Sequence, residues 1–256
     1  MTTPPARLQE LITLSRLIGE PGRDLVILAE GNTSVRTGGS SMLVKATGSA
    51  MADADQTDFV HVDLRQYWAL LDGEAADDEA VAQMMSAARR WGEKRPSVES
   101  LLHAVCLRIP EVDAVVHTHP VAVNAVLCSD KADYLVRGSL FPDQVVVLGR
   151  HNLLVPYVDP GLPLARYVQR ALAQHQEQYG SHPKAIYLRN HGLFALGSSP
   201  AQAVQVTEMA VKAARILAGA LASGEPVYLE EENAERIHTR PDEEWRRRVL
   251  EAPGES

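Results

Sequence analysis

The segment Val115-Val116-His117-Thr118-His119 predicts a buried strand that carries two metal-binding side chains. The apolar residues at 114–116 favour a strand, and side chains two residues apart in a strand project from the same face. His117 and His119 are therefore expected to point the same way, so that they can share one metal ion. By itself the pair is an ambiguous zinc signal, because a lone histidine is more often a core or surface residue.

A third histidine strengthens this prediction. His191 lies in the sequence Tyr187-Leu188-Arg189-Asn190-His191-Gly192-Leu193, between two apolar runs that predict strands. Gly192 favours a turn there, which would place the ring of His191 at an end of the sheet. Three neutral imidazoles leave a tetrahedral zinc ion one open position, as a catalytic zinc site requires. The sequence alone does not determine whether the third ring meets the first two.

Helical stretches and short apolar runs alternate around these histidines. Helices are expected over residues 6–19, 99–108, 162–179 and 200–223, and strands over 25–29, 34–36, 42–46, 114–117, 144–148, 153–157, 185–188 and 193–196. Turns at Gly31 and at Gly38-Gly39 predict a β-hairpin region near the N-terminus. No repeat or low-complexity linker interrupts this pattern, which indicates one mixed α/β domain over residues 1–256.

Composition and charge exclude several classes of partner. The chain has 256 residues, of which 45% are hydrophobic and 23% charged, as in ordinary globular proteins. Its formal net charge of −8 disfavours nucleic acid as a partner. The N-terminus shows no basic region followed by an apolar region, and no run of about 18 apolar residues occurs. We therefore expect a cytoplasmic protein without a membrane partner.

Two further features are expected to be structural. From about residue 230 the chain becomes a charged extension, with the runs Glu230-Glu231-Glu232 and Arg246-Arg247-Arg248, which is typical of a solvated helix face. Cys106 and Cys128 follow no CxxC spacing and lie among apolar residues, so both are expected to be reduced, packed thiols.

The segment Arg95-Pro96-Ser97-Val98-Glu99 predicts the start of a helix. Ser97 is a plausible N-cap, and the free N–H groups at a helix start can bind an anion. For Glu99 alone, the simplest interpretation is that an acidic residue in the first turn complements the helix dipole.

Taken together, five ordered motifs resemble the class II aldolase/adducin family over roughly residues 8–221. The motifs are Glu30-Gly31-Asn32-Thr33-Ser34, Ala46-Thr47-Gly48, Pro96-Ser97-Val98-Glu99, His117-Thr118-His119 and Asn190-His191-Gly192. The resemblance implies a single three-layer α/β/α domain with a central, mainly antiparallel sheet. It also implies a homotetramer with active sites near the subunit boundaries.

The resemblance further implies a role for individual residues. His117, His119 and His191 would hold one Zn²⁺, or another divalent metal, in each subunit. Glu99 would complete the resting metal sphere and act as the general base once substrate displaces it. The phosphate of a sugar phosphate would lie in a cradle made by Gly31, Asn32, Thr47, Gly48 and Ser97.

Some positions depart from the family pattern or remain open. Val98 stands where the sugar-phosphate aldolases commonly have a second serine, so one hydroxyl donor to phosphate is missing. The family aldolases also use a tyrosine from across a subunit boundary to protonate the leaving fragment. Of the candidates Tyr134, Tyr157 and Tyr228, Tyr134 follows the histidine segment at about the expected distance. His103 lies four residues after Glu99 on one helix face and could bond its carboxylate, although a structural role is the simpler expectation.

The function expected from this resemblance is a zinc-dependent aldolase. It would reversibly cleave a ketose 1-phosphate, or a related sugar phosphate, to dihydroxyacetone phosphate and an aldehyde. A sugar-phosphate decarboxylase or a 4-epimerase could use the same site, although the epimerases typically have aspartate in place of Glu99. A non-catalytic, adducin-like binding domain is a further alternative, because a fold alone does not imply activity.

Overall fold

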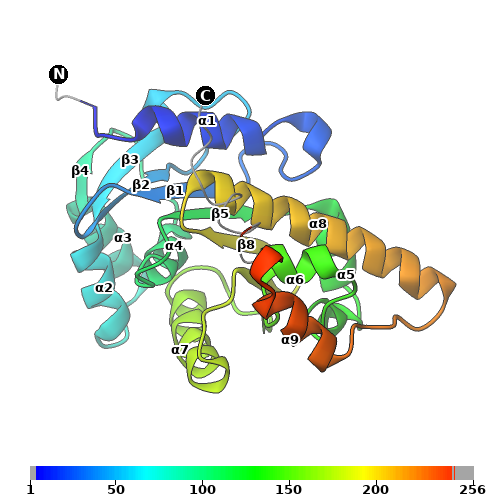
Figure 1. The fold of residues 1–256 in the computed structure, drawn as a ribbon. Coiled ribbons are helices and arrows are strands. Elements are labelled where there is room, and N and C mark those ends of the chain that lie inside the picture. Colours follow the sequence, from blue (N-terminus) through cyan, green and yellow to red (C-terminus); the bar gives the residue numbers. More distant parts are fainter. Residues whose placement is uncertain (1–3, 244, 246–256) are drawn as a thin grey trace.

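The computed structural model describes residues 4–243 and residue 245, and its centre is an eight-stranded sheet (Figure 1). The strands are β1 Asn32–Arg36, β2 Ser41–Lys45, β3 Phe59–Asp63, β4 Arg89–Trp91, β5 Ala114–Thr118, β6 Leu153–Val155, β7 Ala185–Leu188 and β8 Gly192–Gly197. Their order in the sheet is β4-β3-β2-β1-β5-β8-β7-β6. Only the β6–β7 pair is parallel among these neighbours. The predicted α/β class and mainly antiparallel sheet are thus confirmed.

Helices cover both faces of the sheet. They are α1 Leu8–Ile18, α2 Leu64–Asp72, α3 Asp78–Ala87, α4 Ser100–Cys106, α5 Val121–Leu127, α6 Pro142–Leu148, α7 Leu162–Tyr179, α8 Pro200–Ser223 and α9 Glu231–Thr239. Figure 1 shows α1 and α8 on one side of the sheet and α2, α4 and α7 on the other. Along β5, Val116 packs into the apolar cluster beneath α1 and α8, while Val115 packs into the opposite cluster. This alternation gives the three layers.

The two long helices begin and end where the sequence predicts. The side chain of Ser199 accepts a hydrogen bond from the backbone N–H of Gln202 at the start of α8, and Pro200 occupies the first turn. Gly180 ends α7 in the left-handed conformation, with φ of 69°, which a residue without a side chain adopts at little cost. Local capping signals therefore specify these boundaries.

Two of the predicted strands are wrong. Residues 25–29 form a loop, in which Ile27 and Leu28 are exposed and the backbone N–H of Ile27 donates to the carboxylate of Glu30. Residues 144–148 belong to α6, which begins at Pro142. Val145 and Val146 of α6 are buried against α9, and this packing outweighs the strand preference of a valine run.

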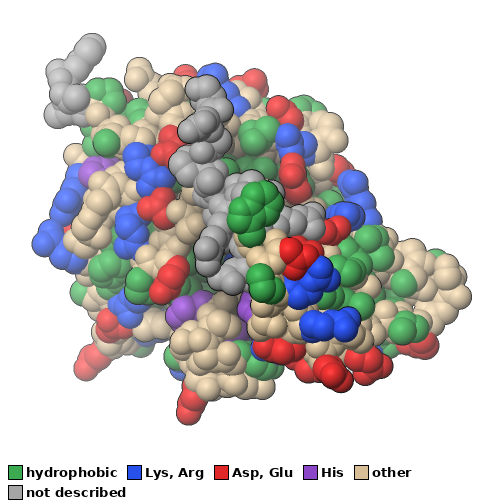
Figure 2. Space-filling model, in the orientation of Figure 1, with side chains coloured by type: hydrophobic (Ala, Val, Ile, Leu, Met, Phe, Trp, Pro, Cys, Tyr) green, Lys and Arg blue, Asp and Glu red, His purple; other side chains and the backbone are tan. Residues whose placement is uncertain are grey.

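The charged extension packs onto α6 through only a few apolar residues. Ala234 and Ile237 of α9 contact Val145 and Val146, and Arg150 forms ion pairs with Glu231 and Glu235. Acidic and basic side chains lie side by side over α9 (Figure 2). The run at 230–232 is exposed, as predicted, whereas the predicted solvated run at 246–248 lies outside the described residues.

Two smaller expectations can also be compared with the structure. Cys106 is buried, as predicted, but Cys128 is exposed, because it lies just beyond the last turn of α5. Across residues 4–243 and 245, every helix is too short or too polar to cross a lipid bilayer.

Candidate metal centre

His117 and His119 meet at the end of the central strand β5. The backbone of His117 pairs with Asn32 of β1 on one side and with Phe194 of β8 on the other, which fixes its register. Its ring stacks on Phe194 at a centroid distance of 4.1 Å. The Nε2 atoms of His117 and His119 are 3.0 Å apart. The predicted common orientation of the two side chains is confirmed.

His191 reaches the same point from the turn between β7 and β8. Asn190 adopts a left-handed conformation, with φ of 55°, which turns the chain back toward the sheet. A Cβ atom on Gly192 would lie 2.5 Å from the carbonyl oxygen of Thr118 and 2.6 Å from the ring of His119. Glycine therefore permits the close approach. One ligand atom from each of the three histidines lies within 4.8 Å of the others.

The partners of the two β5 histidines determine where their lone pairs point. Nδ1 of His117 lies 3.0 Å from the carbonyl oxygen of Leu193, and Nδ1 of His119 lies 3.0 Å from the carboxylate of Glu30. Each acceptor requires a proton on Nδ1, which leaves Nε2 of a neutral ring as a lone pair. Two lone pairs 3.0 Å apart repel each other unless a cation lies near both. This donor set therefore fits a divalent metal ion.

Glu30 is a site residue that sequence reasoning missed. Its two oxygens are both used, because Oε2 accepts from His119 and Oε1 accepts from the backbone N–H of Ile27 at 2.7 Å. A carboxylate that orients a metal-binding histidine in this way is common. The residue stands within the first of the five motifs, but its spacing from His119 along the chain contains no signal of this contact.

Glu99 places its carboxylate against the ligand atoms. Oε1 lies 2.9 Å from Nε2 of His191 and 3.3 Å from Nε2 of His117, while Oε2 accepts a 2.6 Å hydrogen bond from the side-chain amide of Asn32. Burial acts to raise the pKa of Glu99, but positive charge on His117 and His191, or on a metal ion that takes the place of their Nε2 protons, lowers it by more, so the pKa lies well below its usual range. The group is a carboxylate beside the three rings.

The helix start at this site is later than predicted. Glu99 is the N-cap of α4, and the side chain of Ser97 accepts from the N–H of Glu99 at 3.3 Å. The N-cap prediction for Ser97 is therefore wrong in register, because residues 96–99 form a turn in which Ser100 N–H donates to the carbonyl of Ser97. The turn aims Glu99 at the histidines.

The five expected phosphate residues border this turn in two groups. Gly31, Asn32 and Ser97 are buried beside Glu99, and a Cβ on Gly31 would lie 2.8 Å from the carbonyl oxygen of His117. Thr47 and Gly48 are exposed, and they approach the same turn because Ala46 pairs with Pro96. Nothing lies within 4 Å of a Cβ built on Gly48, so open space adjoins this glycine.

Lys45 is a second residue that the sequence did not reveal. It is fully buried behind the 46–49 turn, and its Nζ donates to the carbonyl oxygens of Ala46 at 3.2 Å and Ser49 at 2.5 Å. Burial lowers the pKa of Lys45 to about 8. The ammonium group thus braces the backbone of the turn that holds Thr47 and Gly48.

The remaining candidates lie in other contacts. His103 is buried with Nδ1 2.7 Å from the hydroxyl of Ser34, not on Glu99, which favours the structural role. The hydroxyl of Tyr134 donates to Glu225 at 3.3 Å, and the hydroxyl of Tyr228 donates to the carbonyl of Tyr134. Tyr157 is exposed.

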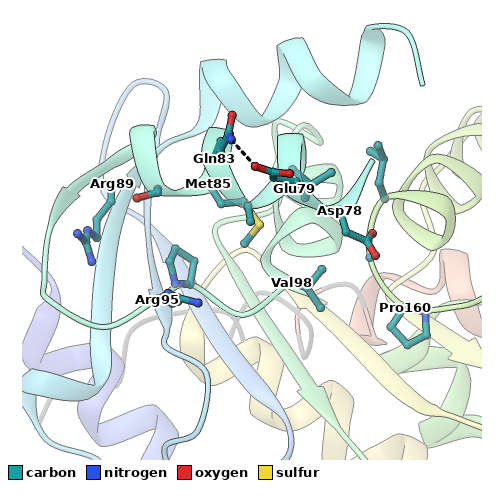
Figure 3. Close-up of a pocket in the computed structure, with 14 residues that line it drawn as sticks. Asp78, Glu79, Gln83, Met85, Arg89, Arg95, Val98 and Pro160 are labelled. Atoms are coloured by element: carbon teal, nitrogen blue, oxygen red, sulfur yellow. Dashed lines mark hydrogen bonds between the residues drawn. The ribbon is translucent and has the colours of Figure 1, made fainter. Parts of the chain in front are cut away.

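A cavity of about 580 Å³ borders the 95–98 segment (Figure 3). It is bounded by α3, by Arg95, Pro96 and Val98, and by residues 160–162 at the start of α7. Val98 is 44% exposed toward this side, and a Cβ on Gly161 would lie 3.2 Å from it. None of the three histidines lines the cavity, so its walls are distinct from the candidate metal centre.

Comparison with known proteins identifies one family model that matches most of the chain. The sequence model described as "Class II Aldolase and Adducin N-terminal domain" matches residues 9–218. The chain is 28% identical over 212 residues to the uncharacterized oxidoreductase YuxG of Bacillus subtilis, a match that covers 79% of this chain but only 28% of that protein.

Two further relatives have named reactions. A methylthioribulose-1-phosphate dehydratase of Pseudomonas savastanoi is 31% identical over 142 residues, covering 53% of this chain and 68% of the enzyme. A 3-oxo-tetronate 4-phosphate decarboxylase of Haemophilus influenzae is 26% identical over 212 residues, covering 82% of this chain and 86% of that enzyme. Among solved structures, an L-fuculose 1-phosphate aldolase superposes with a TM-score of 0.69 at 22% identity, covering 90% of this chain and 93% of the other. The superposition on this aldolase establishes that the two chains have the same fold.

Proposed function

This chain belongs to the class II aldolase and adducin family, and on that premise we propose that it is a metal-dependent lyase acting on a sugar phosphate. The reaction we favour is reversible cleavage of a ketose 1-phosphate to dihydroxyacetone phosphate and an aldehyde. The observation that carries the proposal is the position of Glu99, whose Oε1 lies 2.9 Å from Nε2 of His191 and 3.3 Å from Nε2 of His117. A base is thus held beside a metal-binding donor set.

His117, His119 and His191 would hold the metal, which we propose to be Zn²⁺. A divalent metal at this position supplies a Lewis acid that stabilises negative charge developing next to a carbonyl group. The hydrogen bonds from His117 to Leu193 and from His119 to Glu30 keep both rings in the tautomer that a metal requires. No lysine Schiff base is needed.

Glu99 would carry the proton. In the cleavage direction, the hydroxyl group on the carbon that becomes the aldehyde would give up its proton to Glu99 Oε1. The bond from that carbon to the carbon next to the carbonyl then breaks, and its electron pair stays on the fragment that carries the phosphate. The proton that Glu99 has accepted is then delivered to the carbon next to the carbonyl, which restores the carboxylate, and in the synthesis direction the two transfers run in reverse. The Asn32 amide holds Oε2, so the side chain presents Oε1 in a single orientation.

The phosphate would lie where the 46–49 turn approaches residues 96–99. Ser97 retains a hydroxyl proton to donate, and Gly48 adjoins open space. Lys45 places positive charge behind the turn. Gly31 and Asn32 complete the proposed cradle on the buried side. Because Val98 supplies no hydroxyl group, we expect weaker phosphate contact than in an enzyme with two serines, by about 1 kcal/mol.

A second candidate uses the same site but expels a different group. The matches to the dehydratase and to the decarboxylase span 68% and 86% of those enzymes. This coverage favours loss of water or of carbon dioxide from a phosphorylated keto compound as alternative reactions. In each case negative charge must be stabilised next to a carbonyl, and Glu99 would transfer the proton. The leaving group decides among the three reactions.

The proposal includes a homotetramer in the cytoplasm. In a tetramer Tyr134 could act on a neighbouring site, which sedimentation of the purified protein and assay of Tyr134→Phe would test. If Tyr134→Phe retained full activity in an oligomer, that role would be excluded.

The deciding experiment is a product assay of the zinc-loaded protein. Ketose 1-phosphates, keto-acid sugar phosphates and methylthioribulose 1-phosphate are supplied in turn, and dihydroxyacetone phosphate, carbon dioxide and dehydrated product are each measured. We expect dihydroxyacetone phosphate from at least one ketose 1-phosphate, with activity lost after chelation and restored by zinc. Product formation that is unaffected by chelation would exclude the metal-dependent mechanism. Carbon dioxide or dehydrated product alone would select the second candidate.

A further inference from the structure

The short helix α5 contacts the chain segments of two of the three histidines. It starts two residues after His119, with Pro120 as its N-cap. At its other end, the carbonyl oxygen of Leu127 accepts a 3.4 Å hydrogen bond from the backbone N–H of Asn190. Between these points, the side-chain amide of Asn124 donates to the carbonyl oxygen of His191 at 3.0 Å. The helix therefore links the β5 end to the β7–β8 turn.

His191 is held differently from the other two histidines. His117 and His119 lie at the end of one strand, and an acceptor fixes Nδ1 of each ring. Throughout the described part of the chain, no hydrogen bond to Nδ1 of His191 is found, although its Nε2 faces Glu99. The placement of this ring thus depends on the backbone of the turn, which Asn190 bends through a left-handed conformation.

The amide of Asn124 is oriented by this single contact. Its Oδ1 is buried and makes no hydrogen bond with any described residue. Exchanging Oδ1 and Nδ2 would bring two oxygen acceptors to 3.0 Å, which is repulsive. Burying the unpaired Oδ1 costs free energy, so the hydrogen bond from Nδ2 to His191 is the one favourable polar contact that this side chain makes to residues that the structure describes.

We propose that Asn124 is a positioning residue that fixes His191 as the third ligand of the metal. This inference rests on the proposed metal site, and it assigns to one side-chain amide the contact by which α5 holds His191 itself. Loss of the amide frees the carbonyl of His191 and lets the turn move relative to β5. The two-histidine half of the site remains intact, because its hydrogen bonds do not involve α5 side chains.

The test compares Asn124→Leu with a matched variant, Asn152→Leu. Asn152 is also half-buried and also makes one side-chain bond to the backbone, accepting from Ala185 N–H at 3.1 Å at the start of β7. Zinc affinity is measured by competition with a chromophoric chelator. We expect Asn124→Leu to bind zinc 10- to 100-fold more weakly, the usual effect of losing an outer contact of a ligand. Asn152→Leu should bind as the parent does.

A second measurement does not depend on the metal. Amide hydrogen exchange of the metal-free proteins is followed for the peptide that covers residues 188–193. We expect faster exchange in Asn124→Leu, and in Asn124→Ala as a smaller replacement, but not in Asn152→Leu. Unchanged zinc affinity together with unchanged exchange would overturn the role of Asn124. If the parent protein binds no zinc but Asn124→Leu still exchanges faster than the parent, the proposed metal site is wrong, while the contact between Asn124 and the turn stands.

Discussion

Nε2 of His117 and Nε2 of His119 lie 3.0 Å apart, and Nδ1 of each ring faces a hydrogen-bond acceptor. Neither ring can relieve the contact by moving its proton to Nε2 without losing that acceptor. The protein itself therefore creates a site of unpaired lone pairs, which a cation would satisfy. The geometry of Glu99 and His191 completes the site on its open side.

Replacing Glu30 with leucine should weaken metal binding. The change removes the acceptor that holds His119 in the metal-binding tautomer, and we expect a 10- to 100-fold loss of zinc affinity. Glu30→Gln keeps a neutral acceptor oxygen and should lose less. Competition with a chelator measures both variants, and equal affinity of Glu30→Leu and the parent would show that Glu30 does not orient the ligand.

Replacing Glu99 with glutamine should abolish most activity while zinc stays bound. Three imidazoles remain to hold the metal, but the amide cannot transfer a proton, so kcat should fall by about 10²- to 10⁴-fold. Glu177→Gln, an exposed position on α7, is the control. Turnover of Glu99→Gln within a few fold of the parent would assign the proton transfer to another group and would favour a binding role for Glu99.

Gly192 should not tolerate alanine. The added Cβ would meet the Thr118 carbonyl at 2.5 Å and the His119 ring at 2.6 Å, so the strand end must shift. We expect a loss of about 1–3 kcal/mol in the free energy of unfolding, together with weaker zinc binding. Gly219→Ala is the control, because nothing lies within 4 Å of that Cβ in α8 and alanine favours a helix. Urea unfolding and zinc titration of the two variants would separate these effects.

His103 should make the folded state less stable in acid. Burial lowers its pKa to about 3, whereas an unfolded histidine titrates near 6.5. Between these values the unfolded chain binds the extra proton, so the contribution of His103 is complete above about pH 6.5 and is lost as the pH falls toward 3. Urea unfolding of the metal-free protein across this range should show a steeper decline in the parent than in His103→Gln. Parallel curves would contradict the assignment.

Much of the fold followed from local signals in the sequence. The helices α7 and α8 and the strand β7 have the expected bounds, because periodicity and caps act within a few residues. The loop at 25–29 and the helix α6 were missed for the opposite reason. In the loop, the carboxylate of Glu30 accepts a hydrogen bond from the backbone of Ile27. The helix α6 is stabilised by its packing against α9, which is distant in the sequence.

The site was predictable in its residue types but not in its supporting contacts. The strand period placed His117 and His119 together, while the meeting with His191 required the pairing of β5 with β8. Glu30 and Asn124 each contact a histidine segment more than 60 residues away along the chain, while Lys45 contacts the backbone of the turn that follows it. No spacing rule contains such contacts, so they appear only in the folded chain.

The most direct measurement is a crystal structure of the zinc-loaded protein with anomalous data collected at the zinc absorption edge. We expect one strong anomalous peak per chain, about 2.0–2.1 Å from Nε2 of His117, His119 and His191, with Glu99 adjacent. An ordered, zinc-saturated crystal without a peak at these three atoms, or with the ring of His191 turned away from it, would contradict the account.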